Sequence, residues 1–382
     1  MRDERAGVVI IGGGVMGVSA AFHLAEAGVP DVVLLERDAL GSGSTCKAAG
    51  GVRAQFSDSV NIALGKRSLE AFGRFGHRPG GEIDLHRVGY LFLLDTPGSV
   101  AAFEHAVVLQ NRLGVPSRML APDEAQRLSP LIDPTGLLAA AYSPTDGHCT
   151  PEAVVLGYAS AARRRGAHLH TGRAATGIRV TGGEIVAVET DAGPIATDTV
   201  ICTSGAWARE VGGWVGVELP VTPLRRQIVV TEPVPDLPAD LPMTLDLSST
   251  FYFHREGAGL LVGLSDPDEQ PGFDVALDDA WFPRLGAMIE RRAPRLLDVG
   301  VASRWAGLYE MTPDHNALIG EAPSVSRFLY ATGFSGHGFL MGPAVGEVLR
   351  DLVLGAEPFV DITPLDAGRF AAAATRPELH VI

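Results

Sequence analysis

Cysteine is scarce in this chain: only Cys46, Cys149 and Cys202 occur among 382 residues. The three lie far apart and form no Cys-x-x-Cys pair, so the sequence predicts neither a disulfide framework nor a zinc site. The histidines also lack metal-ligand spacing, and we expect no metal centre. A chain of this kind suits a reducing compartment, which makes a cytoplasmic location our expectation.

Basic charge is in deficit as well. The chain has 31 Lys and Arg residues against 45 Asp and Glu residues, a formal net charge of −14. No long basic run interrupts this balance, so a nucleic acid is not expected as a partner.

Long apolar runs are missing too. No stretch of about 18 uncharged apolar residues occurs, so the sequence predicts no membrane span. The apolar run Val8–Phe22 follows Arg2 and Arg5, and in this it superficially resembles a signal peptide. Asp3 and Glu4 dilute the basic region and glycines break the run, so the pattern argues against that interpretation. With 46% hydrophobic residues over this length, a two-domain globular enzyme is the expected class.

Periodicity at the start of the chain predicts a βαβ unit. Strands are expected over Gly7–Ile11 and Val32–Leu35, with an amphipathic helix over Val15–Ala27 between them. Later patterns predict these further elements: strands at His86–Asp95, His168–His170, Ala174–Val180, Ile185–Asp191, Thr199–Thr203 and Phe328–Thr332; β-rich segments at Pro220–Glu232 and Phe251–Leu264; helices at Val100–Arg112, Pro122–Leu128, Pro151–Arg165, Ala280–Arg292 and Gly342–Val353.

A glycine motif joins the first strand to the first helix. Gly12, Gly14 and Gly17 satisfy Gly-x-Gly-x-x-Gly around Val15 and Met16. In such a turn the first glycine permits the tight bend, the second lets the backbone approach a pyrophosphate, and the third allows close helix packing. Glu36 ends the next strand, where an acid binds ribose hydroxyls, followed by Arg37. The segment is therefore predicted to bind a dinucleotide at a helix N-terminus.

Two other segments favour FAD over a nicotinamide cofactor. The loop Gly41–Thr45 brings small hydroxylated residues close to Glu36. The turn Gly333–Phe339 lies between a strand and a helix, so its backbone amides are placed to face the electron-rich side of a reduced flavin. A nicotinamide dehydrogenase would leave this second turn unexplained.

The order of motifs along the chain resembles the D-amino-acid oxidase superfamily, nearest to its sarcosine oxidase, glycine oxidase, and sarcosine and dimethylglycine dehydrogenase branch. The motifs that carry this resemblance are Gly-x-Gly-x-x-Gly, Glu36, Gly43-Ser44-Thr45, Ser204-Gly205-Ala206-Trp207, Pro220–Gln227, Trp305-Ala306-Gly307, Thr312-Pro313-Asp314 and Gly333–Gly338.

The resemblance implies an α/β plus β fold, with a Rossmann-like FAD-binding domain interleaved with an antiparallel-sheet substrate domain. We assign residues 1–85, 146–218 and 306–382 to the first domain, and residues 86–145 and 219–305 to the second. The implied activity is oxidation of a C–N bond in a small secondary amine or amino acid, by hydride transfer to flavin N5. The implied cofactor contacts are Gly12, Gly14, Val15, Met16, Gly17, Glu36, Arg37, Gly43, Ser44, Thr45, Lys47, Ala49, Gly50, Gly51, Ser204, Gly205, Trp207, Gly307, Gly333, Gly336, His337, Gly338, Phe339 and Leu340.

Departures from the family pattern bear on how the flavin is held. Some relatives tether it through a histidine where this chain has Lys47, and others through a cysteine where this chain has Gly307. We therefore expect non-covalent FAD. Cys46 is near the first of these positions but matches neither, and we interpret it as a small buried side chain.

The substrate anchors of relatives are also replaced. A lysine that holds the substrate carboxylate in sarcosine oxidases corresponds to Leu340, and an arginine of glycine oxidases corresponds to Tyr309. Arg53, Lys47 and Tyr252 remain as candidates to orient a substrate, with Arg53 best suited to a carboxylate. The alternatives are that Arg53 pairs with a phosphate or an internal acid, that Lys47 lies at the flavin edge, and that Tyr252 belongs to the core.

The electron acceptor stays open between O2 and an unidentified carrier, because the lysine that assists oxygen activation in sarcosine oxidases corresponds to Leu261. His337 lies in the C-terminal glycine turn, and we favour a structural and electrostatic role for it over proton transfer. A different class also remains possible. The stretch Gly50–Ser57 resembles an oxidoreductase-like protein linked to respiratory complex assembly, so the chain is alternatively an FAD-binding subunit or assembly factor with little turnover and a partner subunit.

Overall fold

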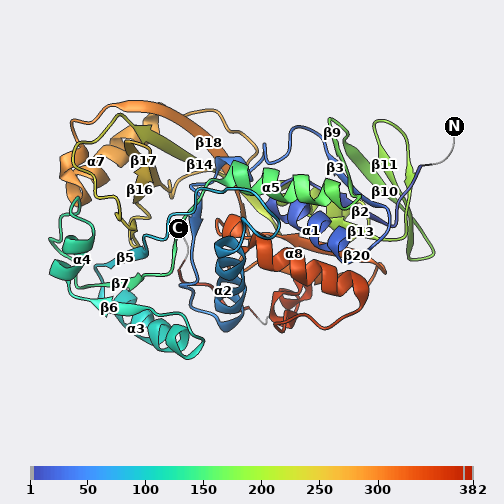
Figure 1. Ribbon diagram of the computed structural model, residues 1–382, viewed down its shortest axis with the longest axis horizontal. Coiled ribbons are helices and arrows are strands. Elements are labelled where there is room, and N and C mark those ends of the chain that lie inside the picture. Colours follow the sequence, from blue (N-terminus) through green and yellow to red (C-terminus); the bar gives the residue numbers. More distant parts are fainter. Residues whose placement is uncertain (1–3, 373–374, 381–382) are drawn as a thin grey trace.

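The computed structural model describes residues 4–372 and 375–380, which form a mixed α/β fold with several sheets (Figure 1). Elements of the largest sheet gather at one end of the long axis, and the glycine-motif strand and helix lie at the other end. Helix α2 (Ser59–Gly73) lies between the two groups.

A six-stranded sheet contains the glycine-motif strand. Its order is β19-β20-β13-β2-β3-β9, and all neighbours are parallel except β19 and β20. The strands are β2 (Val8–Ile11), β3 (Val32–Glu36), β9 (His168–Thr171), β13 (Val200–Cys202), β19 (Leu318–Glu321) and β20 (Phe328–Thr332). Parallel strands need crossover connections, and their apolar sequences suit a sheet that is covered on both faces.

Three helices cover one face of this sheet. They are α1 (Val15–Glu26), α5 (Pro151–Arg164) and α8 (Gly338–Leu354). Alternate strand residues such as Ile10 and Leu34 pack into their core. Helix α1 is buried from Val15 to Leu24, because α5 and α8 both pack against it.

The opposite face of the six-stranded sheet packs against a smaller sheet and α6 (Ala208–Gly213). Strand residues of opposite parity, such as Val9 and Val33, enter this second core. The smaller sheet has the order β1-β12-β11-β10, with the strands β1 (Glu4–Arg5), β10 (Ala175–Thr181), β11 (Glu184–Thr190) and β12 (Ile195–Ala196).

The largest sheet has eight strands in the order β18-β14-β17-β16-β15-β5-β7-β6. They are β5 (Tyr90–Leu94), β6 (Arg118–Leu120), β7 (Ala139–Ser143), β14 (Thr222–Thr231), β15 (Met243–Asp246), β16 (Tyr252–Glu256), β17 (Gly259–Leu264) and β18 (Val301–Met311). The expectation of a purely antiparallel sheet is wrong at one place, because β15 pairs with β5 in parallel. These two strands are far apart in sequence, so no hairpin fixes their direction.

The remaining elements flank these sheets. Strands β4 (Gly51–Val52) and β8 (Gly147–His148) form a two-stranded pair. Helices α3 (Pro97–Arg112), α4 (Pro122–Leu128) and α7 (Phe282–Arg292) lie at the end of the molecule that holds the eight-stranded sheet (Figure 1).

Three local expectations need correction. The strand expected from His86 begins only at Tyr90, because Gly89 adopts a φ of +89° that interrupts extended backbone. Helix α8 starts at Gly338 rather than Gly342, with Pro343 inside it. Helix α2 was not expected at all, although Asp58 caps it by accepting a hydrogen bond from the Val60 amide.

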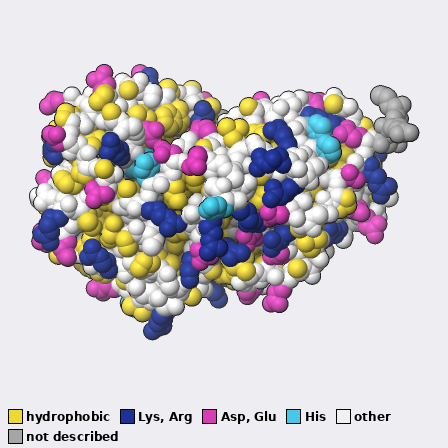
Figure 2. Space-filling view, in the orientation of Figure 1, with side chains coloured by type: hydrophobic (Ala, Val, Ile, Leu, Met, Phe, Trp, Pro, Cys, Tyr) yellow, Lys and Arg dark blue, Asp and Glu magenta, His cyan; other side chains and the backbone are white. Residues whose placement is uncertain are grey.

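No helix within residues 4–372 or 375–380 is both long and apolar enough to span a bilayer. Basic and acidic side chains are interspersed over the face shown in Figure 2.

Candidate active site

One continuous cavity extends from the glycine turn between β2 and α1 to strands β14, β16 and β18 of the eight-stranded sheet. Most of the sequence-predicted site residues line it. They are Gly12, Gly14, Val15, Met16, Glu36, Arg37, Gly43, Ser44, Thr45, Lys47, Ala49, Gly50, Gly51, Arg53, Ser204, Gly205, Trp207, Tyr252, Gly307, Tyr309, Gly336, His337, Gly338, Phe339 and Leu340. The fold thus brings together segments from the first 53 residues, the middle and the last 50 residues of the chain.

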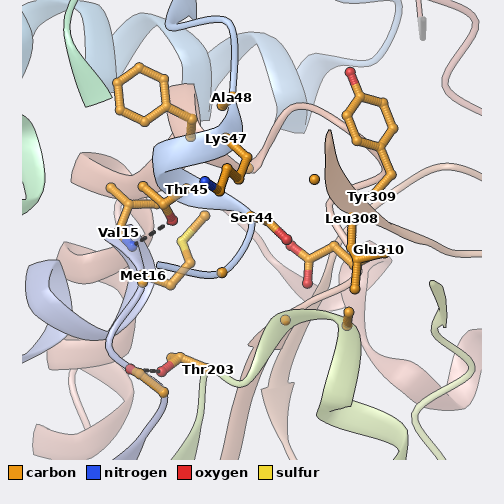
Figure 3. A pocket seen from close by; sticks show the side chains of 18 of the residues that line it. Val15, Met16, Ser44, Thr45, Lys47, Ala48, Thr203, Leu308, Tyr309 and Glu310 are labelled. Carbon is orange, nitrogen blue, oxygen red and sulfur yellow. Dashed lines mark hydrogen bonds between the residues drawn. The ribbon is translucent and has the colours of Figure 1, made fainter. Parts of the chain in front are cut away.

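The turn between β2 and α1 has the shape that its glycines allow. Gly12 has a φ of +113°, and a Cβ there would lie 2.4 Å from the carbonyl oxygen of Thr203. The Thr203 hydroxyl donates to the Gly12 carbonyl at 3.0 Å (Figure 3). A Cβ on Gly17 would lie 1.9 Å from the Gly12 oxygen, so this residue packs the helix against the turn without lining the cavity.

Gly14 differs from Gly12 and Gly17 in two ways: its backbone angles are common to all residues, and only one protein atom lies near the position of a Cβ. Its φ of −73° suits any residue, and a Cβ there would approach only the Thr45 hydroxyl, at 3.1 Å. It caps α1 without a side-chain hydrogen bond, while the Val15 amide donates to Thr45 Oγ1 at 3.1 Å (Figure 3). The helix N-terminus therefore faces a cavity with space beside the backbone.

The acid after β3 lies beside this turn. Glu36 accepts hydrogen bonds from the Gly13 amide and the Asp38 amide, each at 2.8 Å. The Arg37 guanidinium lies 4.0 Å above the ring of Trp207. The amides at the start of α1 suit the pyrophosphate of a dinucleotide, and the Glu36 carboxylate suits the hydroxyls of its ribose.

The C-terminal glycine turn closes the other end of the cavity. Gly336 has a φ of +98°, and a Cβ there would lie 2.3 Å from the Tyr309 ring, so only glycine lets this ring lie on the turn. Gly333 has a φ of +70° but does not line the cavity. His337 is buried, and desolvation lowers its pKa to about 3. Its imidazole is therefore neutral at pH 7, which removes a cationic role.

Three buried phenols cluster at this end. Tyr90, Tyr252 and Tyr309 line the cavity, and burial raises the pKa of each above the ordinary value for tyrosine. All three are neutral hydrogen-bonding groups at physiological pH. Tyr252 both lines the cavity and belongs to a buried hydrophobic cluster, as the core alternative expects.

Arg53 lines the cavity, where a substrate carboxylate or a phosphate could reach it. Its guanidinium is buried and donates to the Gln55 carbonyl and, at 2.6 Å, to the carbonyl of His380. Desolvation lowers its pKa. No carboxylate pairs with it among the described residues, so the pairing expected with an internal acid is not seen there. Both Nη atoms of Arg53 already donate to a backbone carbonyl.

Lys47 and Gly307, the two positions considered for a flavin tether, lie against each other. A Cβ on Gly307 would lie 2.5 Å from the Lys47 Cβ, and the Lys47 carbonyl accepts from the Trp305 indole at 3.0 Å. Cys46 is half-buried and does not line the cavity, and desolvation raises its pKa to about 11. The thiolate form, which is the nucleophile, is therefore disfavoured at Cys46.

Sequence reasoning missed several residues of the wall, including Tyr90, Arg226, Met243 and Glu310. Glu310 follows the partly buried Tyr309 on β18, and the two side chains leave the strand in different directions (Figure 3). It accepts from the Thr332 hydroxyl at 3.0 Å, while burial raises its pKa to about 7. Only the strand register brings these residues to the cavity, and no local motif marks them.

Residues 7–352 match the family of FAD dependent oxidoreductases known as DAO, and the chain belongs to this family. The fold and the dinucleotide-shaped cavity agree with that membership. Dimethylglycine dehydrogenase, mitochondrial, of Mus musculus is 31% identical over 392 aligned residues, which cover 97% of this chain and 45% of that protein. The chain thus spans less than half the length of this relative.

Two solved structures are similar over almost the whole of both chains. The L-proline dehydrogenase from P. horikoshii has a TM-score of 0.91 and 31% identity, covering 98% of this chain and 100% of the other. The glycine oxidase from Geobacillus kaustophilus has a TM-score of 0.85 and 26% identity, covering 96% and 99%. The chain is therefore similar over its length to solved chains of about its own size, as well as to part of a longer relative.

Proposed function

We propose that this protein uses FAD to oxidise a C–N bond in a small secondary amine or amino acid, giving an imine that water hydrolyses. The observation that carries the proposal is the single cavity that links the helix N-terminus at Gly14 to the cluster of Tyr252 and Tyr309. Names of similar proteins, among them a dimethylglycine dehydrogenase and an L-proline dehydrogenase, support this substrate class.

The chain's own residues would divide the work between the two ends of the cavity. Amides at the start of α1 and the Glu36 carboxylate would hold the dinucleotide part of FAD. When bound, FAD supplies the acceptor for the hydride that leaves the carbon next to the amine nitrogen. The neutral phenols of Tyr252 and Tyr309 would orient the substrate, and neutral His337 would support the turn at Gly336.

The division into two domains is part of the same proposal. The six-stranded sheet and its helices would form the FAD-binding domain, and the eight-stranded sheet the substrate domain, with the segments interleaved along the chain. The sequence-based boundary at residues 305 and 306 falls inside β18, so we place that boundary after Met311.

Turnover tests the proposal against the alternative of an FAD-binding subunit or assembly factor. Sarcosine, dimethylglycine, L-proline and glycine would be supplied with an artificial electron-accepting dye, and the carbonyl product would be measured. We expect steady turnover of at least one of them. A flavin-containing protein that turns over none of this panel would favour the alternative.

FAD is proposed to be held without a covalent bond, because Lys47 and Gly307 occupy the two positions of the tether in relatives. Heat or acid precipitation should release all of the yellow flavin into the supernatant. Flavin that stays with the washed pellet and with a single peptide after proteolysis would contradict this prediction.

A further inference from the structure

Arg226 on β14 is a cation with unused hydrogen-bonding capacity in the cavity wall. Its Nε is buried without a partner within the described part of the chain, and its Nη1 donates to the Arg225 carbonyl at 2.9 Å. A buried guanidinium donor that stays unpaired costs free energy, so such a group is usually satisfied by a ligand, an ion or water.

Two other arginines are paired with carboxylates: Arg292, which is buried, and Arg225, the neighbour of Arg226 in the sequence. Arg292 pairs with Asp246 at 2.7 Å, and Arg225 pairs with Glu269 at 3.0 Å. Arg226 has no such carboxylate among residues 4–372 and 375–380. Arg226 does not share the carboxylate partner of Arg225, because side chains alternate along a strand and the two arginines point to opposite faces of the sheet.

The register of the sheet places Arg226 in the phenol cluster. It lies opposite Gly307 of β18, and its guanidinium carbon is 5.1 Å from the centre of the Tyr309 ring. Its charge also acts on Tyr252, lowering the pKa of that phenol against the larger effect of burial. Arg226 therefore lies at the substrate end of the cavity.

None of the other charged side chains at the phenol end of the cavity forms an ion pair with Arg226 among the described residues. Arg53 and Lys47 are cations too, and Arg53 already donates to two carbonyls. The acid on the adjoining strand β18, Glu310, accepts a hydrogen bond from the Thr332 hydroxyl at 3.0 Å. Glu36 is engaged with the amides of the glycine turn. Glu378 and Asp146 act on Arg53, whereas the buried Nε donor of Arg226 has no partner among the described residues and fits an anion.

We propose that Arg226 binds the carboxylate of the substrate, which makes an amino acid, rather than an amine without an acid group, the substrate of this protein. The inference rests on the proposed function and names its substrate class. A guanidinium presents paired donors that match a carboxylate, and a cavity that leaves such donors unpaired discriminates against amines that lack the acid.

The test compares an acid with its amide on the FAD-loaded protein. Calorimetry would measure the binding of pyrrole-2-carboxylate and of pyrrole-2-carboxamide to the wild type, Arg226→Gln and Arg226→Lys. Arg225→Gln is the matched control, because it removes a neighbouring arginine on the opposite face. In Arg226→Gln we expect the carboxylate to bind on the order of 10- to 100-fold more weakly, with lysine intermediate and the amide unchanged.

The substrate arm uses anaerobic flavin reduction by L-proline and by pyrrolidine. Arg226→Gln should raise the half-saturating concentration of proline by a similar factor and leave that of pyrrolidine unchanged. Equal carboxylate binding by Arg226→Gln and the wild type would overturn the inference, as would equal losses for acid and amide, or carboxylate binding undetectable in the wild type. Carboxylate binding that depends on Arg226, in a protein whose flavin no amine reduces, would instead refute the proposed function and keep the inference.

Discussion

A Gly14→Val variant is expected to fold normally and to bind no FAD. The backbone of Gly14 is compatible with any residue, and the one protein atom near a new Cβ would be the Thr45 hydroxyl, which lies 3.1 Å away and would have to shift slightly. It would extend into the cavity where the helix N-terminus faces the ligand. Crowding the ligand and losing charge-assisted amide contacts should together cost about 3 kcal/mol of binding free energy or more.

The measurement is the flavin content of the purified variant and the affinity of the apoprotein for added FAD, with circular dichroism to follow the fold. Gly286→Val is the matched control, because a Cβ at Gly286 in α7 meets nothing within 4 Å and lies far from the cavity in the structure. A Gly14→Val protein that keeps full flavin at unchanged affinity would contradict the assignment of this turn.

The second large effect is expected from a buried ion pair that holds the last described segment. Arg369 makes a two-pronged contact with Asp314, at 2.8 and 2.9 Å, and both side chains are almost fully buried. Removing either partner leaves an uncompensated buried charge, so Asp314→Ala or Arg369→Met should each lower the free energy of unfolding by about 3 to 5 kcal/mol.

Chemical denaturation of the two single variants and the double variant would measure this effect. The double variant should be less destabilised than the sum of the singles, because it buries no lone charge. Asp123→Ala in the exposed pair with Arg127 is the control, and it should change stability little. Additive losses would show that the pair is not coupled.

This pair also bears on the cavity through the chain that follows it. The Glu378 amide donates to the Asp314 carbonyl at 3.0 Å, and the Glu378 carboxylate accepts from the Ser57 hydroxyl at 2.8 Å. Two residues later, the His380 carbonyl accepts from Arg53. The end of the described chain therefore supplies part of the surroundings of a cavity residue.

Local sequence signals predicted the parts of the site that depend on local structure. The first βαβ unit and its glycine turn were expected where the structure has them, because a glycine turn between an apolar strand and a helix has few alternatives. The C-terminal turn was recognisable for the same reason, since its glycines also lie between a strand and a helix. The structure adds that Gly336 is needed where Tyr309 lies on the backbone.

Residues that depend on long-range register could not be predicted in this way. Arg225 and Arg226 are identical neighbours in the sequence, and only the pairing of β14 with β18 decides which of them enters the cavity. The contact of Arg53 with His380 joins positions 327 residues apart, so no local pattern marks it. The parallel pairing of β15 with β5 was hidden for the same reason.

The central claim is that a flavin bound in this cavity takes electrons directly from a small amine or amino acid. The most direct measurement is the absorption spectrum of the purified protein during anaerobic addition of sarcosine, dimethylglycine, L-proline and glycine. We predict flavin bands that bleach with at least one of them, and readmitted oxygen would then show whether O2 is the acceptor. A protein without flavin bands, or with bands that none of these compounds bleaches, would contradict the account.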